Sequence, residues 1–320
     1  TGIVYLPIAI ASISANLKKH NIQHKVIDLF GIKPKEIKRI DNFLIIGDEI
    51  INYEAEICNS KAVFIFANQV INHISIIKII KQIRTINKEV KIFTFENTQA
   101  VTAYSLKEIY NDFIFCKNDY VIIGEPEEKI LNIYKNLNNQ DNLKNINGLI
   151  CSEFQNYKRD IIKELDELPI PNWDYIPLEN YWKLKYAHGP FSTNKYISIL
   201  TSRGCPYPCR FCVIPETNDR KWRFKSPKKV VDEIEHYKNK LSISEFHLED
   251  VNPTINEKRV KEICQELISR KLNINWKVVA GTKVESIKDI KTIDLMAQSG
   301  CSYISISPES GSKDLMKKIN

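Results

Sequence analysis

Three of the eight cysteines, Cys205, Cys209 and Cys212, crowd into a segment of eight residues. They are separated by three and by two residues, and Pro206 and Pro208 stiffen the chain between them. Thiolates at this spacing can converge on one metal centre. A structural zinc would require a fourth protein ligand, and no second cysteine pair stands nearby in the sequence. A cubane cluster has four irons, so three cysteines would hold it and leave one iron open to a substrate.

The spacing C-x3-C-x2-C, with Phe211 before the third cysteine, resembles the signature of the radical S-adenosylmethionine (SAM) superfamily. This resemblance implies that the three cysteines ligate a [4Fe–4S] cluster whose free iron is chelated by the amino and carboxylate groups of SAM. It also implies reductive cleavage of SAM to a 5′-deoxyadenosyl radical, with an electron donor such as flavodoxin or ferredoxin as partner. In such enzymes the cofactor performs the difficult chemistry while the protein orients it and excludes water. We therefore expect Phe211 beside the cofactors.

Acidic residues stand at the ends of two predicted strands. Glu249 and Asp250 end one strand, where the family often places an acid that receives the SAM ammonium group. Both stay candidates, and the alternative is an acid pair that favours the loop before a helix. Residues 307–312 resemble the fourth-strand segment that contacts SAM, which makes Glu309 and Ser310 candidates for binding the ribose hydroxyls. The alternative for Glu309 and Ser310 is a role at the end of the strand.

Basic residues also surround this region. Lys283 occupies the third strand, where relatives often carry a basic residue, although a solvent-facing lysine is the alternative. Four arginines surround the cysteine loop, and we interpret them as surface charge, with contact to an anionic substrate or electron donor as the alternative: Arg203, Arg210, Arg220 and Arg223.

From residue 191 onward, strand patterns alternate with helix patterns. We expect strands at residues 196–200, 243–250, 276–284 and 303–309. Ser226 and Asn256 are predicted to cap the first two helices, and Gly300 is predicted to end the third. Repeated βα units at this spacing predict a TIM-like barrel. About four strands are too few to close one, so the predicted radical SAM core, residues 191–320, is partial.

Residues 1–137 show a second alternation. We expect strands at 25–30, 62–67, 90–95 and 119–124, and helices at 71–86 and 126–137. This order predicts a parallel, doubly wound, Rossmann-like α/β domain. Residues 6–28 and 121–128 resemble elements of the cobalamin-binding domain that precedes the radical domain in one subgroup of the superfamily. The opening strand of that domain is expected to be missing, and both ends of the chain are expected to be truncated.

Residues 138–190 are predicted to link the two domains. Residues 138–147 are polar, and Pro169, Pro171 and Pro177 interrupt regular structure. One hairpin is expected near residues 148–154. Residues 168–182 resemble the linker that precedes the radical domain in the same subgroup.

The first domain departs from the cobalamin-binding pattern in two places. Asp28 to Gly31 supplies no histidine, so the Asp-x-His-x-x-Gly motif that ligates cobalt is absent. The paired glycines expected after the fourth strand are replaced by Phe95 and Glu96. Glycines would let the backbone approach the cofactor tail, and this pair is expected to obstruct it. Cobalamin stays a candidate cofactor, and the expectation is weak or absent binding.

Composition excludes several classes of protein. The chain has 320 residues, of which 43% are hydrophobic and 27% charged, enough for two ordinary cores. Its net charge of +7 is spread along the sequence, so we expect no nucleic-acid partner. No apolar run approaches the roughly 18 residues of a membrane-spanning helix, and a cytoplasmic location is expected. Cys264 lies on an apolar helical stripe and is predicted to belong to the core.

Together these features predict a radical SAM enzyme of unknown substrate, with methyl transfer to an unactivated carbon as the reaction if cobalamin is used. The first alternative is a cobalamin-independent radical SAM enzyme with a degenerate first domain. The second is a non-enzymatic metal or redox sensor built on the same three cysteines.

Overall fold

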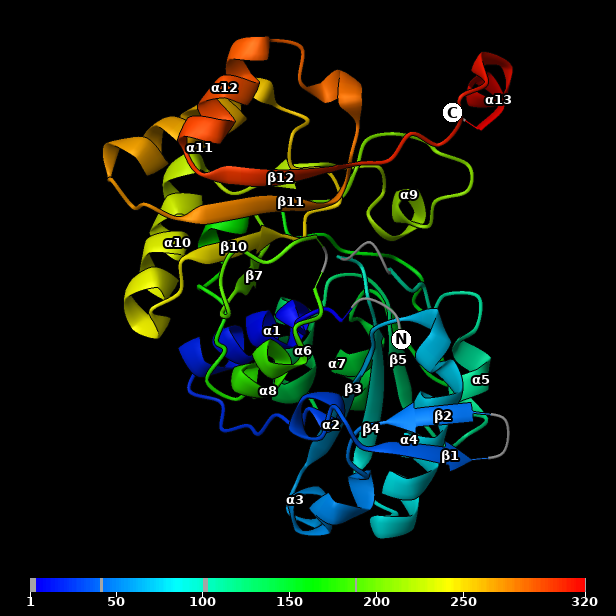
Figure 1. Ribbon diagram of the computed structural model, residues 1–320. Helices are drawn as coiled ribbons and strands as arrows, with labels where there is room; N and C mark the ends of the chain where they lie inside the picture. The colour runs from blue at the N-terminus through cyan, green and yellow to red at the C-terminus, as the bar shows by residue number, and fades with distance from the viewer. Residues whose placement is uncertain (1–3, 41–42, 100–102, 188, 320) are drawn as a thin grey trace.

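The computed structural model describes residues 4–40, 43–99, 103–187 and 189–319. Its fold is α/β, with two four-stranded sheets that lie one above the other in Figure 1. Strands β3 to β6 form the lower sheet, and β7, β10, β11 and β12 form the upper sheet.

The lower sheet has three parallel strands and one antiparallel edge strand. Its order is β3 (Ala62–Ala67), β4 (Lys91–Glu96), β5 (Tyr120–Ile122) and β6 (Leu149–Ile150). Helix α4 (His73–Ile86) packs into the hydrophobic cluster on one face, and α6 (Glu127–Lys135) packs into the cluster on the other. The predicted strands at 62–67, 90–95 and 119–124 are confirmed, and the predicted hairpin at 148–154 becomes the edge strand with a bridge from Ile150 to Gln155.

The predicted strand at residues 25–30 is wrong. Asp28 instead caps the short helix α2 (Leu29–Ile32) by accepting a 2.8 Å hydrogen bond from the Gly31 amide. A side chain that satisfies a nearby backbone amide stabilises a helix start and competes with a strand. An unexpected antiparallel hairpin follows, formed by β1 (Ile37–Ile40) and β2 (Phe43–Ile46).

The upper sheet is entirely parallel, as a series of βα units predicts. Its order is β7 (Ile197–Ile199), β10 (Glu245–Leu248), β11 (Asn275–Thr282) and β12 (Cys301–Ile306). The intervening helices are α10 (Pro227–Leu241), α11 (Glu257–Ser269) and α12 (Ile290–Gln298). Ser226 and Asn256 cap α10 and α11 by accepting hydrogen bonds from Lys229 and Arg259 amides, as predicted. Strand β12 is shorter than the predicted strand at 303–309.

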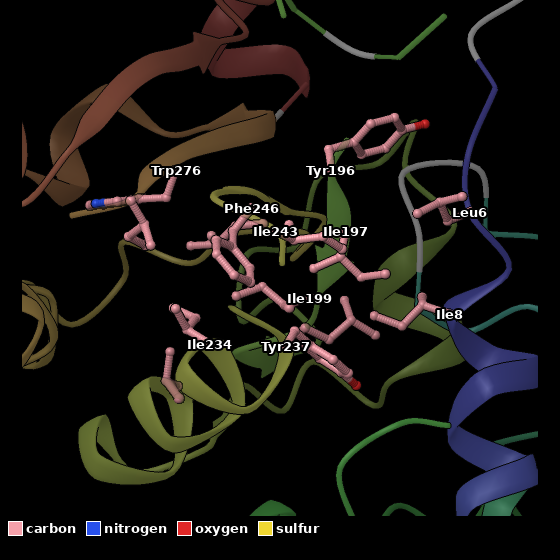
Figure 2. Close-up of a cluster of buried hydrophobic side chains, with 14 of the residues drawn as sticks. Leu6, Ile8, Tyr196, Ile197, Ile199, Ile234, Tyr237, Ile243, Phe246 and Trp276 are labelled. Carbon is pink, nitrogen blue, oxygen red and sulfur yellow. The ribbon is translucent and has the colours of Figure 1, made fainter. Parts of the chain in front are cut away.

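Helix α1 (Ile8–Lys19) joins the two sheets. Leu6 and Ile8, at its start, belong to the same buried cluster as residues of β7, β10 and α10, which Figure 2 shows. Ile13 and Leu17, farther along the helix, pack in the cluster of the lower sheet. Residues 4–11 thus contribute to the core of the upper sheet, although they precede the predicted radical SAM core in the sequence. The division into residues 1–137, 138–190 and 191–320 stays a prediction.

Short elements complete the chain. Two of them frame the cysteine loop, β8 (Ser202–Arg203) and β9 (Arg223–Phe224), which pair antiparallel. The others are η1 (Ile50–Tyr53), α3 (Glu54–Cys58), η2 (Val70–Asn72), α5 (Tyr110–Ile114), α7 (Gln140–Lys144), η3 (Leu165–Glu167), α8 (Leu178–Leu184), α9 (Ile214–Thr217), η4 (Val284–Ser286) and α13 (Lys313–Ile319). Within the described ranges, no helix has the length and apolar character needed to cross a membrane.

Candidate functional site

The cysteine loop leaves the carboxyl end of β7 through β8 and returns through α9 to β9. The thiols of Cys205, Cys209 and Cys212 are half-buried, and the Cys212 amide donates to the Cys209 carbonyl at 3.1 Å. Burial is the main cause that raises the pKa of Cys205, and the neighbouring Cys209 and Cys212 raise it further. Burial also raises the pKa of Cys212, with further contributions from Cys209 and Glu309. The loop therefore gathers three thiols into one electrostatic neighbourhood.

A single metal ion and a four-iron cluster require different arrangements of the three thiols. Among the described residues, no three His, Cys, Asp or Glu side chains are gathered tightly enough to hold one ion. A tetrahedral zinc requires four ligand atoms around one point, whereas a four-iron cluster takes each cysteine on a different iron. Three thiols on one loop could each bind a different iron of such a cluster.

Gly204 lets the loop begin where it does. Its φ is +77°, a conformation that favours glycine. A Cβ atom at this position would stand 2.2 Å from the Lys221 carbonyl oxygen, so any side chain would push the loop away from its return strand.

Asp250 holds the chain that enters the loop. Its carboxylate is fully buried and accepts hydrogen bonds from the Thr201 amide at 3.1 Å, the Thr201 hydroxyl at 2.8 Å and the Ser202 hydroxyl at 2.6 Å. The Ser202 amide also donates to it. Arg259 completes this arrangement by donating to the Thr201 carbonyl at 2.8 Å. Thr201 and Ser202 thus donate four hydrogen bonds to Asp250, three to Oδ1 and one to Oδ2.

Glu249 is in a different situation. Residues Glu245, His247 and Glu249 alternate with Phe246 and Leu248, which belong to the apolar core. Glu249 is 5% exposed, and the Ser198 hydroxyl donates to it at 2.5 Å. Burial, followed by the neighbouring Asp250, raises the pKa of Glu249 to about 7. Of the two predicted acids, Glu249 keeps more acceptor capacity for a cationic ligand, since it accepts one hydrogen bond where Asp250 accepts four.

The fourth-strand candidates lie at the rim of the loop. Glu309 is exposed, and its charge is close enough to raise the pKa of Cys212. Ser310 lies in the same short segment between β12 and α13, and its hydroxyl accepts a 3.0 Å hydrogen bond from the Ser312 amide. Phe211 is 59% exposed beside Cys212. Lys283 follows β11, and its ammonium group lies 4.1 Å from the centre of the Tyr207 ring within the loop.

The interpretation of all four arginines as surface charge is wrong for two of them. Arg203 and Arg223 are 5% and 9% exposed. Arg203 pairs with Glu127 at 2.6 Å and with Glu125 at 3.3 Å, and Arg223 pairs with Glu125 at 2.8 Å. The glutamate partners lie between 76 and 98 residues earlier in the sequence, so no local pattern could reveal these pairs. Arg210 and Arg220 are exposed, as predicted.

The end of β4 is built differently from the sequence expectation. Phe95 does not reach the sheet edge; it is buried and stacks on Phe66 with ring centres 5.0 Å apart. Glu96 fills the edge by itself. Its carboxylate accepts from the Gly124 amide at 2.6 Å, from the Leu106 amide at 3.0 Å and from Arg159 at 3.1 Å.

Sequence reasoning missed Ser198, Arg259, Glu125 and Glu127 as parts of this region. Ser198 could have been found, because it is the polar residue between Ile197 and Ile199 in an otherwise apolar strand. Arg259 stands on a helix whose charged residues otherwise face solvent, so its pattern carries no signal.

Comparison with known proteins agrees with this geometry. Residues 199–320 match the family described as the radical SAM superfamily. The chain is 31% identical over 157 residues to a cytidylyl-2-hydroxyethylphosphonate methyltransferase of Streptomyces wedmorensis, covering 49% of this chain and 29% of that protein. It is 34% identical over 161 residues to an anaerobic magnesium-protoporphyrin IX monomethyl ester cyclase of Rubrivivax gelatinosus, covering 50% and 27%. The chain therefore spans less than a third of the length of these two relatives.

A solved structure shares the arrangement of both sheets. The radical SAM methyltransferase TsrM of Kitasatospora setae, bound to tryptophan and a SAM analogue, superposes with a TM-score of 0.71 at 16% identity, covering 98% of this chain and 58% of that one. A second structure of TsrM contains cobalamin and a [4Fe–4S] cluster. At this identity the likeness shows a common fold. Residues 199–320, which carry the cysteine loop, are thus the part of the chain that is similar to the radical SAM superfamily.

Proposed function

We propose that this chain is an enzyme that holds a [4Fe–4S] cluster on Cys205, Cys209 and Cys212 and cleaves SAM. The observation that carries the proposal is the gathering of three half-buried thiols on one loop at the carboxyl end of β7, in the part of the chain that matches the family. A bound cluster would supply the electron that breaks a carbon–sulfur bond of SAM to give methionine and a 5′-deoxyadenosyl radical. A flavodoxin- or ferredoxin-like protein is the class of donor expected to reduce it.

The surrounding residues have separate tasks in this proposal. Glu249, which is buried directly after β10, accepts the SAM ammonium group through charge-assisted hydrogen bonds. Asp250 is fully buried and accepts four hydrogen bonds from Thr201 and Ser202, so its task is to keep the entry to the loop in place rather than to contact SAM. Glu309 and Ser310 lie at the rim, within the family-matched segment, and serve the ribose hydroxyls. Phe211 lies beside the ligating Cys212 and shields the cofactors.

The names of the relatives support methyl transfer as the reaction class. A methyltransferase of known substrate, an uncharacterised methyltransferase of Pyrococcus horikoshii at 29% identity over 205 residues, and TsrM all carry this activity in their names. Methyl transfer is therefore our proposal for the whole protein, of which this chain supplies the SAM-cleaving part. The cyclase of Rubrivivax gelatinosus supports a radical rearrangement as the second candidate.

Cobalamin fits this chain less well than the cluster does. At the end of β4, Glu96 and Arg159 occupy the edge of the lower sheet. The Glu96 carboxylate accepts hydrogen bonds from Arg159 and from two backbone amides of neighbouring loops. A cofactor tail laid across this strand would have to displace a buried ion pair. We therefore derive no step through cobalamin, and a direct titration tests it below.

Anaerobic reconstitution with iron and sulfide tests the proposal. We expect about four irons per chain in the wild type, loss of the cluster in Cys209→Ala, and formation of 5′-deoxyadenosine when SAM and dithionite are added. Cys301→Ala is the matched control, since Cys301 is also partly buried but lies on β12, and it should load normally. Full iron loading of Cys209→Ala would contradict the ligand assignment. A loaded wild type that leaves SAM intact would favour the sensor alternative.

A further inference from the structure

Buried ion pairs join the start of helix α6, which packs on the lower sheet, to strand β8, which enters the cysteine loop. Arg203 donates to Glu127 at 2.6 and 3.3 Å, and it also pairs with Glu125 at 3.3 Å. The side chains of the three residues are 5%, 1% and 1% exposed. Glu125 and Glu127 raise the pKa of Arg203 against the effect of its burial, so the guanidinium stays charged.

The return strand is held by the same carboxylate. Arg223 of β9 donates to Glu125 at 2.8 Å and to the Ile162 carbonyl at 2.7 Å. Because β8 pairs with β9, Glu125 contacts an arginine on each strand of the hairpin that frames the loop. Helix α9, which follows the cysteines and lies to the right of the upper sheet in Figure 1, carries Glu216, which pairs with Arg159 at 3.5 Å.

The position of Arg203 decides where the loop begins. It stands two residues before Cys205, and only Gly204 separates them. A shift of Arg203 is therefore expected to be passed on to the start of the loop through a single residue. On the opposite side, Asp250 holds Thr201 and Ser202. The entry to the loop is thus held both by acidic residues near the start of α6 and by Asp250 after β10.

We propose that Glu125, which follows β5, and Glu127, the first residue of α6, are positioning residues for the cysteine loop. They hold the entry and the return of the loop that carries the three thiols before any metal arrives. This role rests on the proposed function, since the loop is the segment proposed to bind the cluster. It gives residues of the first domain a part in cluster assembly, whether or not that domain binds cobalamin. It differs from a simple domain contact, because a contact placed elsewhere would stabilise the protein without ordering the loop.

Amide hydrogen exchange on the metal-free full chain separates these two roles. The variants are Glu125→Gln and Glu127→Gln, which leave an arginine without its charged partner. The matched control is Glu245→Gln, since Glu245 is fully buried and pairs with Lys277 at 2.6 Å but does not contact the loop. We expect peptides covering residues 203–212 to exchange at least about tenfold faster in the first two variants and at the wild-type rate in the control.

A variant that keeps the charge guards against unfolding. Glu127→Asp retains the carboxylate but shortens its reach by one methylene, so the chain should fold while the loop exchanges faster. After reconstitution, we expect lower iron loading and a broadened electron paramagnetic resonance signal of the reduced cluster in all three loop variants.

The outcomes distinguish this inference from the proposed function. A wild type that takes up no iron would refute the proposed function, and the exchange data would still decide the positioning role. Unchanged exchange and unchanged spectra in Glu125→Gln and Glu127→Gln would overturn the positioning role while leaving the enzyme proposal intact. Equal acceleration in Glu245→Gln would also overturn it, because general destabilisation would then explain the effect.

Discussion

Glu249→Gln is the substitution for which the structure gives the sharpest expectation. Burial raises the pKa of Glu249 from its ordinary 4.5 to about 7 in the folded protein. Each unit of pKa corresponds to about 1.4 kcal/mol, so the shift amounts to about 3 kcal/mol. Because the folded protein keeps the proton to a higher pH than the unfolded chain does, the stability falls as the pH rises from about 4.5 to about 7. Above pH 7 the full loss applies.

Glutamine resembles the neutral form of this side chain. Its amide oxygen can still accept the hydrogen bond from the Ser198 hydroxyl. The variant should therefore match the wild type near pH 4.5 and exceed it by about 3 kcal/mol in free energy of unfolding above pH 7. Its SAM affinity should change in the opposite direction. At pH 8 we expect weakening by roughly 1.5–3 kcal/mol, because a charged hydrogen bond to the ammonium is lost.

Urea denaturation under reducing, anaerobic conditions at several pH values measures the first effect, and equilibrium dialysis of the reconstituted protein with SAM measures the second. Wild-type affinity for SAM should rise with pH up to about 7, while that of Glu249→Gln should be flat. The exposed Glu285→Gln on η4 is the control and should change neither quantity. Wild-type stability that does not vary between pH 5 and 8, or equal SAM affinity in the variant, would refute the reasoning.

Three further expectations follow from the same contacts. Asp250→Asn replaces a carboxylate oxygen near the Thr201 N–H by an amide group, so it should lower the free energy of unfolding by about 2–4 kcal/mol in urea titrations. The folded fraction should bind SAM normally. Reduced SAM affinity without destabilisation would reverse the roles of Glu249 and Asp250. Cys264→Ala should keep a full complement of iron and cost about 1–2 kcal/mol of stability, because this thiol is completely buried in the core; lost iron would make it a ligand. Hydroxocobalamin followed by gel filtration should leave little corrinoid on the protein, because Glu96 fills the end of β4; one retained equivalent per chain would show that the cofactor bypasses this strand.

Local patterns in the sequence were sufficient for most elements of both sheets. Strands at 62–67, 90–95 and 119–124 and the capped helices α10 and α11 were predictable, because periodicity and capping residues act within a few positions of one another. The strand at 25–30 failed for the same reason: the side chain of Asp28 forms a local hydrogen bond that overrides a short β-branched run. The hairpin of β8 and β9 has two residues per strand, too few to produce a pattern.

The cysteine spacing, by itself, determined the chemistry that this chain can support, because three thiols within eight residues stay neighbours in any fold that keeps the loop compact. Tertiary structure alone decided what the charged residues do. It gave two adjacent acids different surroundings. Glu249 is buried and accepts a hydrogen bond from Ser198, whereas Asp250 accepts several from Thr201 and Ser202. It also turned Arg203 from an apparent surface charge into the buried partner of Glu127. The role of a charge depends on its dielectric surroundings and its partners, and both are set by segments far away along the chain.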